Sequence, residues 1–253
     1  MKIAITTPIY ITNTILADYF QKYTSSIQTK HKLCFIPVVN LCNQKLTYAN
    51  LDTYEIQGRQ PQGVAKAWND GIKKAWELKC KYCIVANQDI ILNPYAIDNL
   101  VDFMEENIDI DIGSMTVSDT LERTINEKPL NNTLNALHWS NFIVRLDVFD
   151  KFGEFDENFM PAYYEDNDMG TRVTLNDGKL AGNNGSLFYH EGSMTLKNDQ
   201  SLASQNSVTF ENNKKYFISK WGREPCGDKE ELLKTFYHHP YNEEDKDIKY
   251  WRH

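Results

Sequence analysis

The sequence lacks any long hydrophobic segment. Its 253 residues contain no run that approaches the roughly 20 apolar residues needed to cross a bilayer. The N-terminal stretch MKIAITTPIY has one lysine and a short β-like run, without the longer apolar segment and small-residue cleavage site of a secretory signal. We therefore expect a cytoplasmic protein with no membrane span.

Positive charge is also scarce. The chain has 27 Lys and Arg residues against 35 Asp and Glu residues, with a net charge of −8 and a pI near 5.3. A nucleic-acid backbone is bound by clustered Lys and Arg, so this balance argues against a nucleic-acid partner. It leaves room for a local phosphate site, where an acidic protein would use a divalent cation as intermediary.

The cysteines are few and irregularly spaced. Their odd number, five, fits reduced thiols. Cys80 and Cys83 form a CxxC pair, but no second Cys or His pair completes a zinc set. Because the pair closes a predicted helix and opens a predicted strand, we expect a buried structural role instead of metal or redox chemistry.

The first half of the chain alternates strand-like and helix-like segments. Tyr82–Ala86 is a continuous apolar run, typical of a buried parallel strand. Val64–Leu78 has the apolar spacing of an amphipathic helix. The other segments predicted here are strands at Lys2–Thr7 (stopped by Pro8), Leu33–Val39 and Tyr54–Ile56, and helices at Ile15–Ile27 and Tyr95–Glu106.

This alternation predicts an α/β fold with a mainly parallel central sheet flanked by helices. Ligands of such sheets bind at the carboxyl ends of the strands. Thr6–Pro8 and Asn87–Asp89 both stand at such ends, so we expect them to converge on one rim.

The second half is less regular, and no repeat or Gly/Ser linker divides the chain. Its predicted strands are Ile112–Val117, Ser140–Arg145 and Ser186–Tyr189, and its predicted helices are Leu146–Phe152, Glu165–Leu175, Ser207–Lys220 and Lys229–Phe236.

Carboxylates are the first candidates for chemistry. Asp89 follows an apolar strand at the predicted rim, where it is placed to hold a hard cation, although a turn or helix N-cap is the alternative. Glu165, Asp166 and Asp168 follow an aromatic stretch at a predicted helix start. Acidic residues are common in a first helical turn, but beside apolar surface their pKa values rise and they serve as general bases.

Two further side chains stand at informative places. His190 ends a predicted strand and is a candidate to complete a metal shell with Asp89, although a lone histidine is more often structural. Trp139, in HWSNF, is a candidate to stack on a sugar ring, with a core aromatic as the equally good alternative.

The order of these segments resembles glycosyltransferase family 2, particularly its rhamnosyltransferase-like members. Thr6-Thr7-Pro8 is similar to the family's first-strand segment, and GVAKAWNDG at 63–71 is similar to a stretch beside the nucleotide. Asn87-Gln88-Asp89 takes the place of the DxD metal motif, with Asn at its first position. FDENFMPAYYEDND from Phe155 closely matches the family's FDE-to-ED stretch, and YFISKWG resembles a late Lys-Trp-Gly motif.

The resemblance implies a GT-A fold and an inverting transfer from a nucleotide-diphosphate sugar to a hydroxyl acceptor, in the presence of Mn²⁺ or Mg²⁺. It implies that Asp166 is the general base, supported by Glu165 and Asp168, and that Asp89 and His190 hold the metal. The implied residues of the nucleotide-sugar site are Thr7, Pro8, Tyr10, Lys66, Asn69, Asn87, Gln88 and Trp139.

The expected domain covers residues 1–226, with a donor half to about residue 117 and an acceptor half from about 118, followed by a helix and polar tail at 227–253. Three alternatives stay open: a nucleotidyltransferase, a non-catalytic sugar-binding relative of a transferase, and transfer onto modified DNA bases. The first lacks its usual Gly-rich basic loop here, and the acidic charge disfavours the last.

Overall fold

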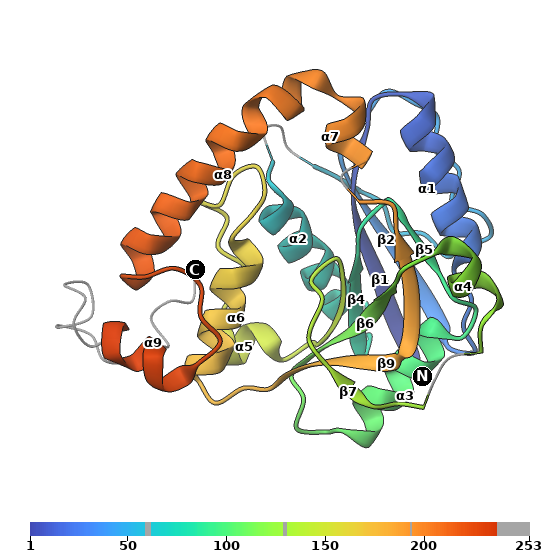
Figure 1. Ribbon diagram of the computed structural model, residues 1–253. Coiled ribbons are helices and arrows are strands. Elements are labelled where there is room, and N and C mark those ends of the chain that lie inside the picture. The colour runs from blue at the N-terminus through green and yellow to red at the C-terminus, as the bar shows by residue number, and fades with distance from the viewer. Residues whose placement is uncertain (59–61, 129–130, 193, 237–253) are drawn as a thin grey trace.

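A computed structural model describes residues 1–58, 62–128, 131–192 and 194–236. One central sheet has helices on both faces (Figure 1). The elements of the first half are β1 (Lys2–Ile11), α1 (Thr14–Ser26), β2 (Lys32–Cys42), β3 (Ile56–Gln57), α2 (Val64–Glu77) and β4 (Tyr82–Ala86).

The described part of the second half holds more elements than we predicted. They are β5 (Ile90–Leu92), α3 (Ala96–Glu106), β6 (Ile112–Ser118), α4 (Leu121–Asn126), β7 (Leu134–Asn135), β8 (Asn141–Arg145), α5 (Val148–Phe152), α6 (Glu165–Leu175), β9 (Leu180–His190), α7 (Met194–Asn198), α8 (Gln200–Trp221) and α9 (Lys229–Phe236). The sequence prediction omitted β5, β7, α4 and α7 and shortened β9.

The sheet is mainly parallel, as predicted, and β8, β5 and β7 run against its other strands. Its strand order is β3-β2-β1-β4-β8-β6-β9-β5, with β7 beside β9. The four strands on the β3 side are parallel, as predicted, but β8 runs antiparallel to both β4 and β6. β6 and β9 are parallel to each other, so β9 points in the same direction as β4.

Pro8 does not stop the first strand. β1 continues to Ile11, and Pro8 pairs with Val38 of β2. On its other side β1 pairs with β4 only from Ile3 to Thr6. Pro8 therefore lies past the end of β4, where its missing N–H interrupts no second ladder.

Buried side chains form a core on each face of the sheet. One cluster contains Leu16 and Phe20 of α1 and Leu100 of α3, packed against β1 and its neighbours. The other contains Ile72 of α2 and Val173 of α6. These apolar helix faces match the predicted periodicity, and they fix α2 and α6 on the same side of the sheet.

A third cluster joins α6 to the C-terminal helices. Leu175 of α6, Phe217 and Trp221 of α8, and Leu232 of α9 are buried together. α8 and α6 lie side by side in Figure 1. The division at residue 226 stays a prediction, and most of the predicted tail, 237–253, lies outside the described residues. In the described ranges, no helix is both long and apolar enough to span a bilayer.

Candidate active site

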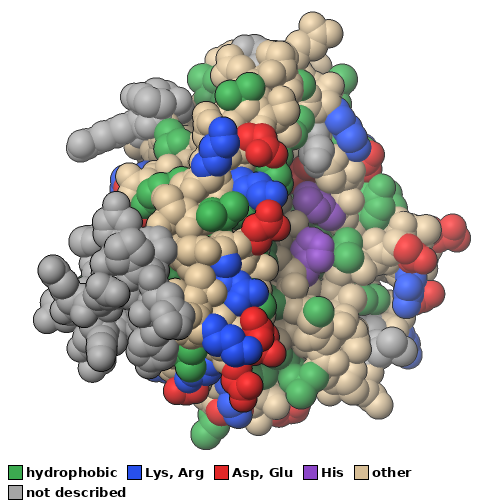
Figure 2. Space-filling model, turned by 60° about the vertical axis from the view of Figure 1, so that its left-hand side comes forward, with side chains coloured by type: hydrophobic (Ala, Val, Ile, Leu, Met, Phe, Trp, Pro, Cys, Tyr) green, Lys and Arg blue, Asp and Glu red, His purple; other side chains and the backbone are tan. Residues whose placement is uncertain are grey.

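A cleft of about 920 Å³ opens at the carboxyl edge of the sheet. Its walls come from the ends of β1, β2, β4 and β9, the segment before β8, the starts of α2 and α6, and the helices α7 and α8. Because β8 is antiparallel, the residues that precede it reach the same edge as the residues that follow β4. Figure 2 shows histidine side chains in a hollow on this face, beside a ridge of alternating basic and acidic side chains.

Asp89 and His190 lie together in this cleft, as the sequence predicted. The Nε2 atom of His190 is 3.2 Å from Oδ1 of Asp89. Their strands explain the approach, because Ile90 of β5 pairs with His190 of β9. The second carboxylate oxygen of Asp89 accepts a hydrogen bond from the backbone N–H of Met194.

A carboxylate oxygen and an imidazole nitrogen suit Mn²⁺ or Mg²⁺ as a partial ligand set, which a diphosphate and water complete. Among the described residues, no group of three or more His, Cys, Asp or Glu side chains forms a metal cluster. The pair therefore fits a cation that is shared with a bound phosphate group and does not build a closed structural site.

The opposite wall carries Glu165 and Asp166 at the start of α6. Glu165 is only 5% exposed, and burial together with the neighbouring Asp166 raises its pKa to about 8. Burial also raises the pKa of Asp166, which is partly exposed and accepts hydrogen bonds from the backbone and side chain of Asn167. A carboxylate in such surroundings is a stronger base than one in water.

The backbone before these carboxylates is strained. Tyr163 and Tyr164 both have positive φ angles, 81° and 75°, a region that aromatic residues rarely adopt. Asn213 of α8 donates hydrogen bonds to the carbonyls of Ala162 and Tyr163, and Val64 at the start of α2 donates to that of Pro161. These contacts from two helices hold the turn that aims Glu165 and Asp166 at the cleft.

Asp168 does not reach the cleft, which corrects its predicted place beside the base. It is fully buried, and its carboxylate is paired with Arg172 at 3.0 Å and with Lys220 at 2.8 Å. The indole N–H of Trp221 also donates to it at 2.8 Å. Asp168 therefore fastens α6 to the end of α8.

Asp156, within the FDE motif, belongs to the same buried network. Burial by itself would raise its pKa, but Lys220 at 2.7 Å, the backbone of Asn158 and the hydroxyl of Tyr216 lower that pKa to about 2. The FDE, ED and Lys-Trp-Gly motifs thus meet in one ion network behind the cleft, because Lys220 bridges Asp156 and Asp168.

Five of the predicted nucleotide-sugar residues line the cleft: Pro8, Tyr10, Asn87, Gln88 and Trp139. Gln88 both accepts from the backbone N–H of Tyr10 and donates to its carbonyl, each at 2.8 Å. This exchange extends the pairing of β1 toward the residues after β4. Trp139 lies edge-on to Phe142, so it serves both the core and the wall.

Three other predicted residues have structural contacts instead. The amide of Asn69 is fully buried and exchanges hydrogen bonds with the backbone of Phe155 at 2.9 Å. The hydroxyl of Thr7 pairs with that of Tyr23 beneath the sheet edge. Lys66 forms an ion pair with Asp70 one turn along α2. None of the three lines the cleft as the structure describes it.

Sequence reasoning missed many residues of the cleft, among them Asn40, Trp68 and His138. Asn40 Oδ1, Trp68 Nε1 and Glu165 Oε2 are buried polar atoms with no hydrogen-bond partner among the described residues. Buried polar atoms without partners are rare, and three around one cleft indicate a ligand site. Asn40 could have been predicted from the sequence, because it ends the apolar run LCFIPVVN at the same rim.

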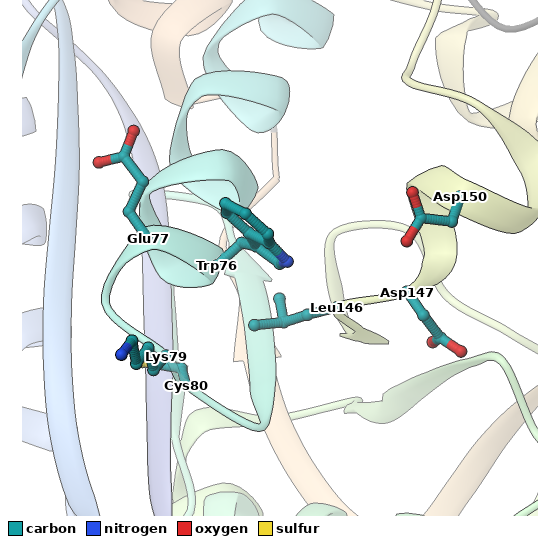
Figure 3. Close-up of a pocket in the computed structure, with 7 residues that line it drawn as sticks. All are labelled: Trp76, Glu77, Lys79, Cys80, Leu146, Asp147 and Asp150. Carbon is teal, nitrogen blue, oxygen red and sulfur yellow. The ribbon is translucent and has the colours of Figure 1, made fainter.

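A second hollow, of about 480 Å³, lies at the opposite edge of the sheet. Figure 3 shows Trp76 of α2 facing Leu146, with Asp150 of α5 across the gap. Cys80 lines it, and burial together with Cys34 raises the pKa of the Cys80 thiol to about 12. A thiol that holds its proton so firmly fits the structural role predicted for the CxxC pair.

No protein-family model and no curated protein sequence matches the chain. Solved structures do. Residues 1–349 of S. aureus TarS, crystallised with UDP-GlcNAc, align with a TM-score of 0.62 and 13% identity over 94% of this chain and 73% of that one. GalNAc-T7 with UDP, GalNAc and Mn²⁺ aligns with a TM-score of 0.59 and 14% identity, over 98% and 57%.

These likenesses show that the chain has the GT-A fold of glycosyltransferases, as the sequence resemblance implied. The chain spans 44% of a longer TarS structure, to which it aligns with a TM-score of 0.58 and 12% identity. At such identities only the fold follows from the comparison.

Proposed function

We propose that this chain is a glycosyltransferase that moves a sugar from a nucleotide-diphosphate sugar to a hydroxyl group of an acceptor. The observation that carries the proposal is that two sets of functional side chains line one cleft. Glu165 and Asp166 lie on one wall, and Asp89 and His190 lie on the other. The GT-A neighbours support it, since TarS was crystallised with UDP-GlcNAc and GalNAc-T7 with UDP.

Asp166 is the proposed general base. Its carboxylate takes the proton of the acceptor hydroxyl while that oxygen forms a bond to the anomeric carbon of the donor. The bond from the anomeric carbon to the phosphate oxygen breaks, and the nucleoside diphosphate leaves with the electron pair. Attack from the face opposite the leaving group inverts the anomeric configuration, as in the family 2 enzymes that the sequence resembles.

Asp89 and His190 are the proposed protein ligands of Mn²⁺ or Mg²⁺. When bound, the cation supplies positive charge that offsets the negative charge developing on the diphosphate. Asn87, next to this pair, adds an amide oxygen at the place where the DxD motif has its first carboxylate. We place the donor nucleotide on the wall that Tyr10 and Gln88 complete. We place the acceptor on the wall that contains Trp139.

The test is a panel of nucleotide sugars with simple glycoside acceptors, read as release of nucleoside diphosphate. We expect Asp166→Asn to lower turnover by a factor on the order of 10² or more, with donor affinity nearly unchanged. Asp150→Asn, an exposed carboxylate of α5 far from the cleft, is the matched control.

Wild-type turnover in the Asp166→Asn variant would refute the base assignment. A wild-type protein that binds nucleotide sugars but releases no nucleoside diphosphate with any donor would instead support a non-catalytic sugar-binding protein.

A further inference from the structure

Residues 137–140 cross the cleft from one wall to the other. All four line it. His138 lies edge-on to Phe188 of β9, with ring centroids 5.5 Å apart. Trp139 turns the other way, toward α6, where a Cβ placed on Gly170 would lie 3.6 Å from its ring. His138 thus belongs to the wall of the Asp89–His190 pair, and Trp139 to that of Asp166.

The position of His138 is fixed by its backbone and by its ring. Its backbone N–H donates to the hydroxyl of Ser114 at 2.8 Å. Its ring Nδ1 accepts a hydrogen bond from the backbone N–H of Ser140 at 3.3 Å. A ring nitrogen that accepts carries no proton, so the proton of the neutral ring is on Nε2. The free end of His138 is therefore a hydrogen-bond donor.

The hydrogen bond at Nδ1 also requires a neutral ring, because both nitrogens of an imidazolium carry protons. Burial lowers the pKa of His138, and the neighbouring His190 lowers it further. A neutral ring is compatible with a divalent cation at the adjacent Asp89–His190 pair, whereas an imidazolium would be repelled by it. His138 thus offers an N–H group without adding a competing charge.

We propose that the Nε2–H group of His138 donates a hydrogen bond to an oxygen of the donor's diphosphate and remains bonded to it as the nucleoside diphosphate leaves. This inference rests on the proposed function, which places the diphosphate at the Asp89–His190 wall. The diphosphate becomes more negative as the sugar–phosphate bond breaks. An N–H group that donates to it therefore stabilises the transition state more than the bound substrate.

The experiment compares His138→Phe, which keeps a ring but no donor, with His138→Gln, whose amide N–H stands in for Nε2–H. Binding of UDP, GDP, dTDP and CDP in the presence of Mn²⁺ is measured by calorimetry, and turnover is measured with the nucleotide sugar that the wild type prefers. His31→Gln, a histidine outside the cleft, is the control. Circular dichroism and melting curves confirm that each variant is folded.

We expect His138→Phe to weaken nucleoside diphosphate binding roughly tenfold and to lower kcat by a further factor of about 10 to 100. His138→Gln should recover most of the lost affinity. No such recovery is expected if the role of His138 is purely structural. His138→Phe that binds and turns over as the wild type, or His138→Gln that fails as badly as His138→Phe, would overturn the assignment while leaving the proposed function intact. A wild-type protein that binds no nucleotide would refute both the assignment of His138 and the proposed function.

Discussion

Glu165 makes a measurable prediction about stability. Its side chain is 5% exposed, and Oε2 has no hydrogen-bond partner among the described residues. Burial, with the neighbouring Asp166, raises its pKa from 4.5 to about 8. Near neutral pH the folded protein therefore keeps a proton on Glu165 that the unfolded chain releases.

The sign follows from proton binding. Between pH 4.5 and about 8 the folded state binds more protons at Glu165 than the unfolded state, so the free energy of unfolding falls as pH rises. Each pH unit in this interval costs about 1.4 kcal/mol, and the whole interval costs about 5 kcal/mol. That total is an upper limit, because side chains relax and water enters the cleft when the carboxylate ionises.

Glu165→Gln removes the ionisable group while keeping nearly the same shape. We expect this variant to match the wild type at about pH 4.5 and to be more stable by about 2 kcal/mol at about pH 6, with the gap widening toward pH 8. Urea unfolding across this pH range measures the difference. Glu106→Gln, on the exposed face of α3, is the control and should give no such trend.

A stability difference that stays constant with pH would refute this reasoning. A Gln variant that is less stable than the wild type near pH 8 would show that ionised Glu165 has a favourable partner, contrary to its burial without one.

Two more variants test the buried network and the metal pair. Lys220→Met leaves Asp156 and Asp168 buried without their shared cation, and we expect a loss of about 3 to 5 kcal/mol in urea unfolding. Adding Asp168→Asn to Lys220→Met should recover part of this loss, and a double variant no better than the single one would count against the network. Asp89→Asn should abolish the Mn²⁺ dependence of nucleotide affinity measured by calorimetry, with His190→Ala giving a smaller loss. Turnover that persists in EDTA would contradict this pair as a metal site.

Elements with strong local periodicity were predictable from the sequence. Tyr82–Ala86, Glu165–Leu175 and Lys229–Phe236 have the predicted bounds, because continuous or helically spaced apolar residues define them without distant help. β5 escaped prediction because its pairing partner, His190, is far along the chain. The first part of β9, rich in Gly and Asn, is a strand only because it pairs with β6.

The same limit applies to the site. Sequence position predicted that Asp89 and His190 would meet, because both end strands that point to one edge. It named Asp166 as the base and Asp168 as a support beside it. Residues two apart on a helix face different directions, and only the packing of α8 shows that Asp168 is on the buried face. Asn69 was misplaced for the same reason, as its amide contacts Phe155 and not the cleft.

The ion network also bears on the order in which the protein is synthesised. Asp156 and Asp168 precede their common partner, Lys220, by 64 and 52 residues, respectively. During synthesis α6 therefore precedes the cation that links Asp168 to Asp156, although Arg172 of the same helix is already present. The ion network behind the wall that carries Asp166 cannot form until Lys220 and Trp221 have been synthesised. A chain that ends before Lys220 would lack every contact that joins Asp168 to the end of α8.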